Sequence, residues 1–209
     1  MPDMPPVSLT ERRKNETRLD IARTAAALFV ADGLRATRAE DIARAAGVAP
    51  RTFYRYFPTK EESVAPLFAA GAQQWAEAVR AAPAELSVPD ALRHAVREAL
   101  GAETAGAVES LDWVRSLLRM SVESAALRAV WADACHASEQ TLLAVLGERA
   151  APGERADAAH SLDLRLAAAV ASAAVRVGVE TWAGDSSGSD GPAALAERCL
   201  AALEAFPWP

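Results

Sequence analysis

The sequence has few cysteines and histidines, and each shortage excludes a class of protein. The two cysteines, Cys135 and Cys199, are far apart and form no CxxC pair, which fits a reduced cytoplasm and argues against a disulfide framework. The three histidines are too few for a metal cage, and the pair His136 and Glu139 lacks a third and a fourth ligand in a similar helical context. We therefore expect a cytoplasmic protein that uses neither a metal nor a cofactor.

Long apolar segments are also missing. The longest alanine-rich apolar run, residues 166–175, is much shorter than the roughly 20 residues of a membrane span and has charges on both sides. Residues 1–9 contain proline and aspartate but no apolar stretch, so we expect neither a signal peptide nor a membrane partner. Because 51% of the 209 residues are hydrophobic, the chain can nevertheless bury a substantial core.

The net charge of −6 is unevenly distributed along the chain. Residues 10–60 contain eleven Lys or Arg and six Asp or Glu, whereas residues 61–209 contain eleven Arg and twenty-one Asp or Glu. A basic N-terminal third joined to an acidic remainder is the asymmetry expected when one part of a chain binds nucleic acid.

Alanine is abundant and no period-2 alternation of apolar residues persists, which predicts an all-α fold of about nine helices. We expect an N-terminal three-helix domain over residues 8–57 and a C-terminal helical bundle over residues 58–209, connected by a long helix over residues 59–82. Capping boxes at Ser8–Glu11 and Thr59–Glu62 predict two helix starts, and Pro66 predicts a kink in the connecting helix. Further helices are expected over residues 90–103, 108–120, 124–148, 162–182 and 192–206, with linkers at 82–89 and 184–191.

The segment Ala46–Glu62, "AGVAPRTFYRYFPTKEE", predicts the second helix of a helix-turn-helix. Gly47-Val48-Ala49 separates two short helices, and Pro50 suits the first position of the second one. Phe53 and Phe57 are four residues apart, so both can point inward. The other face then presents two guanidinium groups, two phenols and a hydroxyl, on Arg51, Thr52, Tyr54, Arg55 and Tyr56.

These side chains suit a DNA major groove. Arginine can pair with base edges or phosphates, while the hydroxyls of tyrosine and threonine donate to phosphate oxygens. Lys60 is expected at the N-terminus of the next helix, and Thr37 and Arg38 stand at the start of the preceding one, where an anion is favoured. Each charge alone could belong to an ordinary solvated face; their coincidence with the turn and the inward aromatics favours DNA.

The pattern Thr37-x4-Ile42-Ala43-x2-Ala-Gly47-Val48-x3-Thr52-Phe53-Tyr54-x-Tyr56-Phe57-x2-Lys60-Glu61 resembles the DNA-binding domain of TetR-type transcriptional regulators over about fifty residues. The resemblance implies DNA contacts at Thr37, Arg51, Thr52, Tyr54, Arg55, Tyr56 and Lys60. The family usually has Ser or Thr where this chain has Ala49, so the recognition helix lacks a side-chain cap. That loss costs about 1 kcal/mol and is tolerable if Pro50 pre-sets the turn.

The C-terminal part is similar to regulators whose second domain is described as acyl-CoA-like ligand binding, the mycofactocin-type regulators among them. A pocket for an apolar chain-like ligand would be lined by side chains on three expected helices, with Arg115, Arg119 or Arg176 beside an anionic head group. The expected set is Trp113, Leu117, Met120, Trp131, Cys135, Val170, Ala174 and Arg176. The same apolar stripes also fit an ordinary core, and the arginines also fit surface ion pairs.

We therefore expect a homodimeric, ligand-responsive repressor that binds a palindromic operator, because one short recognition helix contacts too few bases. The alanine-rich segment 167–175 and a ridge of Leu195, Cys199, Leu200, Leu203 and Phe206 are expected to form a four-helix dimer interface. Two alternatives remain: an architectural DNA-binding protein without an effector, and an all-helical enzyme that binds a phosphorylated substrate. The sequence offers no acid–base pair that could serve such an enzyme, so we expect that the protein is not an enzyme.

Overall fold

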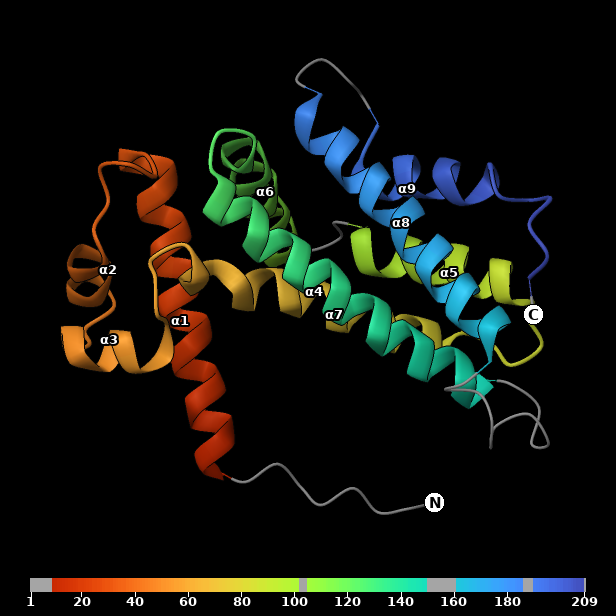
Figure 1. Ribbon diagram of the computed structural model, residues 1–209, viewed down its shortest axis with the longest axis horizontal. Helices are drawn as coiled ribbons and strands as arrows, with labels where there is room; N and C mark the ends of the chain where they lie inside the picture. Colours follow the sequence, from red (N-terminus) through yellow and green to blue (C-terminus); the bar gives the residue numbers. More distant parts are fainter. Residues whose placement is uncertain (1–8, 102–104, 150–160, 186–189, 209) are drawn as a thin grey trace. The chain divides into compact units, whose positions relative to one another are not determined.

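The computed structural model describes residues 9–101, 105–149, 161–185 and 190–208, and within these ranges the chain forms α-helices, one 3-10 helix and no strand. The prediction of an all-α fold is confirmed, with nine α-helices among the described residues (Figure 1). The chain divides into two compact units, residues 1–67 and 68–209. Each unit has its own core and is described separately below.

The first unit contains helices α1 (Leu9–Asp32), α2 (Ala39–Ala45) and α3 (Pro50–Tyr56) and the 3-10 helix η1 (Glu62–Val64). Its core is apolar and comes from every one of these elements. Helix α1 contributes a face on which side chains recur at helical spacing, and η1 closes the core against α1. The largest fully buried side chains of the unit are Ile21, Phe29, Ile42, Phe53, Phe57 and Val64.

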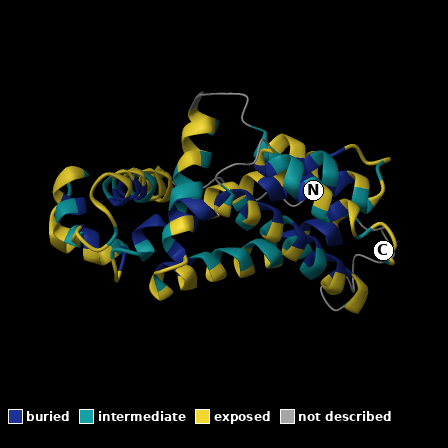
Figure 2. Cartoon of the chain, turned by 90° about the horizontal axis from the view of Figure 1, so that it is seen from above, coloured by how far each residue is buried: buried dark blue, intermediate teal, exposed yellow. Residues whose placement is uncertain are grey.

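The second unit contains most of α4 (Ala65–Ala81), together with α5 (Val88–Leu100), α6 (Ala105–Ser121), α7 (Ala125–Arg149), α8 (Leu162–Gly184) and α9 (Pro192–Ala201). Figure 2 shows buried residues along the inward faces of these helices and exposed residues on their outer faces. One continuous apolar core joins α4, α5, α7, α8 and α9. Its members on α8 are mostly alanine, which allows the neighbouring helices to approach closely.

The predicted connecting helix over residues 59–82 is wrong at its start. The Thr59 hydroxyl does accept a hydrogen bond from the Glu62 amide at 3.2 Å, but Glu62 is the first residue of the short η1, whose N-cap position is Glu61 and has no side-chain cap. Helix α4 begins only at Ala65, which makes Pro66 its second residue. A proline there removes no helix hydrogen bond, because the first amides of a helix have no intrahelical partner. The expected kink at Pro66 therefore has no cause.

Three other expectations concern where helices, units and loops begin and end. Helix α9 ends at Ala201 rather than near residue 206, and residues 202–206 continue the chain as turns and a bend. The units divide after Leu67, whereas the expected domain boundary followed residue 57, because η1 packs on α1 and buries Val64 in the first core. Ser8 of the expected capping box and residues 186–189 of the expected loop over residues 184–191 lie outside the described residues.

The connection between α4 and α5, expected as a plain linker, is held by one side chain. The Arg149 guanidinium donates to the backbone carbonyls of Ala82 at 2.8 Å and Pro83 at 2.9 Å. At the other end of the connection, the Ser87 hydroxyl caps α5 by accepting from the Asp90 amide. The end of α7 is thereby tied to this corner of the bundle.

Helices α8 and α9 pack backbone to backbone within one chain. A Cβ atom added at Gly178 would lie 2.6 Å from the backbone N and Cα of Ala196, closer than packed atoms allow. The ridge expected on α9 takes part in this packing: Leu200 is buried, and Cys199, Leu203 and Phe206 pack partly buried against the core of the same chain. The dimer interface expected there stays a prediction.

Gly178→Ala is expected to destabilise the second unit by about 1–3 kcal/mol, because backbone atoms of α9 must move to admit the methyl group. Gly71→Ala is the matched control: it also lies inside a helix, nothing lies within 4 Å of its added Cβ, and a gain of about 0.5–1 kcal/mol is expected. Urea unfolding of both variants measures the difference. A Gly178→Ala protein as stable as the parent would contradict this packing.

Candidate nucleic-acid interface

The turn between α2 and α3 depends on one glycine. Gly47 has φ +69°, in the left-handed region that side-chain-bearing residues rarely adopt. The turn is closed by the Val48 amide, which donates to the Ala43 carbonyl at 2.9 Å. Helix α3 starts with Ala49 at the N-cap position, without a side-chain cap, and with Pro50 as its first residue. The absence of a cap at Ala49, predicted from the sequence, is therefore confirmed.

The inward face of α3 anchors the helix in the first unit. Phe53 is fully buried and Phe57 nearly so, with ring centroids 5.7 Å apart. The Arg18 guanidinium of α1 stacks over the Phe57 ring at 5.4 Å. Val48 is half-buried beside them. These contacts fix the rotation of α3 about its own axis, so they also decide which side chains face solvent.

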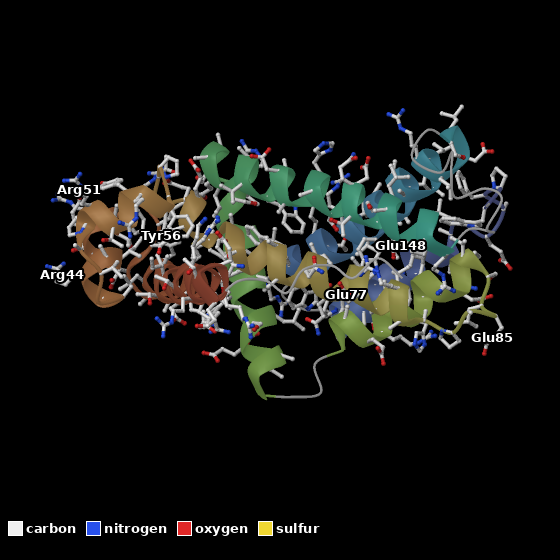
Figure 3. All side chains as sticks on the ribbon, turned by 90° about the horizontal axis from the view of Figure 1, so that it is seen from below. Arg44, Arg51, Tyr56, Glu77, Glu85 and Glu148 are labelled. Atoms are coloured by element: carbon white, nitrogen blue, oxygen red, sulfur yellow. The ribbon has the colours of Figure 1, made fainter. Side chains whose placement is uncertain are left out.

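The outward face of α3 is cationic and phenolic, as expected. Arg51, Tyr54 and Arg55 are exposed, and Thr52 and Tyr56 are half-buried. The Arg55 guanidinium stacks over the Tyr56 ring at 5.4 Å, which restricts both side chains. In Figure 3 the Arg51 guanidinium points away from the helices at the end of this unit. The outward face of α3 thus presents hydrogen-bond donors that a ligand can contact without a change in the fold of this unit.

Tyr54 already has an acidic partner, which the sequence did not indicate. Its hydroxyl donates to the Glu40 carboxylate of α2 at 3.0 Å. This hydrogen bond raises the pKa of the Tyr54 phenol above its ordinary value, so the group stays a neutral donor. Glu40 and Tyr54 are fourteen residues apart, and only the geometry of the turn brings them together.

Thr37 and Lys60 face inward, whereas the sequence-based expectation placed both on phosphates. Thr37 is only 3% exposed, and its hydroxyl donates to the Gly33 carbonyl at 3.0 Å. The Lys60 ammonium donates to the carbonyls of Leu34 at 2.6 Å and Thr37 at 2.8 Å. Since α4 begins only at Ala65, no α-helix N-terminus adjoins Lys60. Both side chains brace the loop that leads into α2.

Two further arginines border the outward face. Arg38 is exposed at the N-cap position of α2, where its amide donates to the Asp41 carboxylate at 3.2 Å. Arg44 is exposed in the last turn of α2 and pairs with Asp41 (Figure 3). Arg44 is not among the DNA contacts expected from the sequence, although the three-residue spacing of Asp41 and Arg44 on a short helix indicates their pairing. The exposed cations therefore extend from α2 to α3.

Lys60→Met is expected to lower the stability of the first unit by about 1.5–3 kcal/mol, because the methionine makes no hydrogen bond to the two carbonyls. Lys14→Met is the control: Lys14 makes only an exposed pair with Glu11, at 3.6 Å, and a change within about 1 kcal/mol is expected. Unfolding followed by circular dichroism gives both values. The role as a brace would be refuted by an unchanged stability together with a reduced salt dependence of DNA binding, which marks a lost phosphate contact.

The residues expected to line a ligand pocket lie in the second unit, and the structure joins three of them. The indole Nε1 of Trp131 donates to the Glu180 carboxylate at 2.7 Å, and the same carboxylate pairs with Arg176 at 3.1 Å. Cys135 lies close enough to be influenced by both charges, and burial raises the pKa of its thiol to about 12. Among the others, Leu117 and Ala174 are buried, whereas Trp113, Met120 and Val170 are half-buried.

The two other candidate arginines have structural partners instead. Arg115 donates to the Asp185 carbonyl and stacks over the Trp182 ring at 5.1 Å. Arg119 donates to the Ala183 carbonyl at 2.7 Å. Both therefore satisfy carbonyl groups at the C-terminal end of α8, where a cation is favoured by the helix dipole.

Two other kinds of site are absent from the described part of the chain. No group of three or more His, Cys, Asp or Glu residues in these ranges is arranged to hold a metal ion. None of the described helices is long and apolar enough to cross a membrane.

The turn, the buried aromatic face and the exposed cations of α3 define a helix-turn-helix protein. Comparison with known proteins names the family. Residues 21–64 match the family model described as bacterial regulatory proteins, tetR family. This match covers the helix-turn-helix of the first unit and agrees with the TetR-type pattern recognised in the sequence.

The curated relatives are matched over part of their length. TcmR of Streptomyces glaucescens, an HTH-type transcriptional regulator, is 36% identical over 104 residues, which is 50% of this chain and 46% of TcmR. MftR of Mycobacterium tuberculosis, whose name assigns it to the regulation of mycofactocin biosynthesis, is 44% identical over 57 residues, or 27% of this chain and 29% of MftR. The matches thus span less than half the length of either relative.

A solved structure extends the likeness to most of the fold. FadR of Thermus thermophilus, a TetR-family transcriptional repressor in complex with lauroyl-CoA, is 26% identical with a TM-score of 0.55. The likeness covers 89% of this chain and 92% of FadR. The N-terminal helix-turn-helix and the C-terminal helical domain are therefore both features of the family fold.

Proposed function

We propose that this regulator binds a palindromic DNA operator as a homodimer, represses transcription, and is released from DNA by a small apolar effector. The observation that carries the proposal is the outward face of α3. It presents Arg51, Tyr54 and Arg55 to solvent while Phe53 and Phe57 hold the helix from inside. A rigid helix with exposed cationic donors is what major-groove recognition requires.

The DNA contacts fall into two groups in this proposal. Arg51 and Arg55 reach base edges or phosphates, and Thr52, Tyr54 and Tyr56 donate to phosphate oxygens. Arg38 and Arg44 contact the flanking backbone from α2. For the Tyr54 hydroxyl to reach a phosphate, it exchanges its Glu40 partner for the phosphate oxygen. Thr37 and Lys60 support the interface from within rather than touching DNA.

The homodimer uses a face of α8 that the single chain leaves exposed. Leu162, Leu166 and Val177 are 75%, 46% and 45% exposed, and Ala173 is exposed between them. Their spacing of four, seven and four residues places all of them on one side of the helix. A second copy of the chain covers this stripe, and we place the interface here because the ridge on α9 that the sequence suggested packs in part against its own chain.

Introducing charge into this stripe, with Leu166→Glu and Val177→Glu together, is expected to convert the dimer into a monomer and to reduce operator affinity at least tenfold, since two linked recognition helices bind far more tightly than one. Sedimentation velocity gives the oligomeric state. Gln140→Glu, on an exposed position of α7, is the control for added charge. Double-variant protein that still sediments as a dimer would exclude this face.

An apolar effector is supported by the likeness to FadR, whose structure contains lauroyl-CoA. In our proposal the effector binds in the second unit and acts through α4, the helix in which the chain passes from one unit to the other. Effector binding changes the spacing of the two recognition helices in the dimer, so that operator affinity falls.

DNA upstream of the gene that encodes this chain is the test duplex, with a random duplex of equal length as the control. Fluorescence anisotropy at 50 and 200 mM salt is expected to show at least a hundredfold preference for a palindrome in the upstream DNA at the higher salt. Equal affinity for both duplexes would favour the alternative, an architectural DNA-binding protein. Failure to bind any duplex at low salt would exclude the proposal altogether.

A further inference from the structure

Helices α4, α7 and α8 share a register that can be read from three contacts. The Phe68 ring of α4 packs against the Trp131 ring of α7 at 5.1 Å, and the Trp131 indole donates to Glu180 of α8. At the far end of α4, Arg80 pairs with Glu148 of α7 at 2.7 Å (Figure 3). Helices α4 and α7 therefore run in the same direction, whereas α8 runs back along α7 (Figure 1).

This register places Trp75 and Ser172 at the same level of the bundle. Trp75 follows Phe68 by seven residues, or about 10 Å along α4, and Ser172 precedes Glu180 by eight residues, or about 12 Å along α8. Because the two helices run in opposite directions, both displacements are toward the same end. Trp75 also belongs to the same apolar core as Ala171 and Ala174, the core residues of α8 on either side of Ser172.

Both residues carry a buried hydrogen-bonding atom without a partner. Trp75 is only 5% exposed, and its indole Nε1 makes no hydrogen bond in the structure. The Ser172 hydroxyl is likewise buried and unpaired. More than nine in ten buried polar groups in proteins have a partner, so two unpaired donors at one level of one bundle require an explanation.

A third buried atom without a partner, the Nε of Arg115, lies at a different level of the bundle. The Nε of Arg115 is also buried without a partner, but the same guanidinium donates to the Asp185 carbonyl and stacks over Trp182. Trp182 follows Ser172 by ten residues, or about 15 Å along α8. Arg115 is therefore part of the cap at the end of α8 and does not belong with Trp75 and Ser172.

We propose that the Trp75 indole and the Ser172 hydroxyl together bind the carbonyl oxygen of an apolar effector, a molecule of the ketone, ester or thioester type. The indole N–H can only donate, so its partner must be an acceptor, and a carbonyl oxygen can accept from both groups at once. The inference depends on the proposed function only in calling this ligand the effector; binding itself can be measured without DNA.

The surrounding charges favour a neutral carbonyl over a carboxylate. The cation nearest to this level on α8, Arg176, is already paired with Glu180, so it has little charge to offer a second anion. A buried carboxylate would therefore be left without a counter-charge, which is far more costly than burying a neutral carbonyl. The apolar part of the ligand lies among Trp75, the core alanines of α8 and the Phe68–Trp131 pair.

Isothermal titration of the full-length protein with 2-decanone tests this site, with decanoate as the charged comparison. The parent is expected to bind 2-decanone saturably and decanoate at least tenfold more weakly. Ser172→Ala removes one donor with little change in shape, whereas Trp75→Phe removes the other donor together with part of a buried ring, and each is expected to weaken 2-decanone binding about fivefold to tenfold. Because the Ser172 hydroxyl is unpaired in the free protein, Ser172→Ala is not expected to lower the unfolding midpoint in urea, whereas Trp75→Phe is expected to lower it because it leaves a cavity in the core.

Two matched controls separate this role from general effects. Trp208→Phe removes an indole that donates to the Leu203 carbonyl, and Ser116→Ala removes a hydroxyl that donates within α6. Neither is expected to change 2-decanone binding. The proposal is overturned if the parent does not bind 2-decanone up to its solubility, if decanoate binds more tightly, or if Trp75→Phe and Ser172→Ala bind it as the parent does. DNA binding of the ligand-free variants, expected to equal that of the parent, reports on the proposed function separately.

Discussion

Arg51→Ala is expected to weaken operator binding about 5- to 150-fold, because a bidentate arginine contact to a base contributes about 1–3 kcal/mol of discrimination. Arg51 is exposed at the start of α3, where the N-terminal residues of a recognition helix meet base edges. The loss should be concentrated at one base pair in each half-site. Anisotropy titrations against a series of single-base-pair variants of the operator measure both the size of the loss and its position.

Arg198→Ala is the matched control for Arg51→Ala. Arg198 is also exposed, but it is on α9 and pairs with Asp190 at 3.3 Å. Its removal should leave operator affinity within twofold of the parent. An Arg51→Ala protein that loses affinity equally for operator and random duplex would contradict base recognition and assign Arg51 to the phosphate backbone.

Phe53→Ala is expected to destabilise the first unit by about 3–5 kcal/mol, the usual cost of removing a fully buried aromatic ring. Phe53 contacts the rings of Tyr54 and Phe57, at centroid distances of 5.6 and 5.7 Å, so its loss also frees the helix that carries the outward face. Operator binding should fall with it. Phe53→Leu, which keeps most of the buried volume, should cost clearly less.

The aromatic residues allow the two units to be followed separately in this experiment. Both tyrosines, Tyr54 and Tyr56, lie in the first unit, and all five tryptophans lie in the second. Phe53→Ala should therefore shift unfolding detected by far-ultraviolet circular dichroism while leaving the tryptophan fluorescence transition in place. Equal shifts of both signals would show that the effect is not confined to the first unit.

The outward face of α3 was predictable because it depends on spacing alone. Four-residue intervals put Phe53 and Phe57 on one side of a helix and Arg51 and Arg55 on another, and a glycine at the turn fixes where that helix begins. The turn and the inward ring pair are present as expected, with Gly47 at φ +69°. Local rules of this kind need no knowledge of distant residues.

The inward positions of Thr37 and Lys60 could not be predicted in the same way. Lys60 donates to carbonyl groups 23 and 26 residues earlier in the chain, and no sequence pattern links a lysine to a backbone acceptor at such a distance. The role of the α9 ridge was open for a related reason. Its apolar spacing was correct, but spacing does not say whether a helix packs against its own chain or against a second copy. The pairing of Tyr54 with Glu40 likewise depends on the turn between two helices.

The attachment of Arg149 to the corner between α4 and α5 bears on how a biosensor could be made from this protein. Two prolines in residues 82–89 would recommend that segment as an insertion point for a fluorescent reporter domain. However, Arg149 donates to the carbonyls of Ala82 and Pro83, so an inserted domain there would break the hydrogen bonds that seat the end of α7. A reporter is better joined to the chain at a position where no side chain holds the backbone.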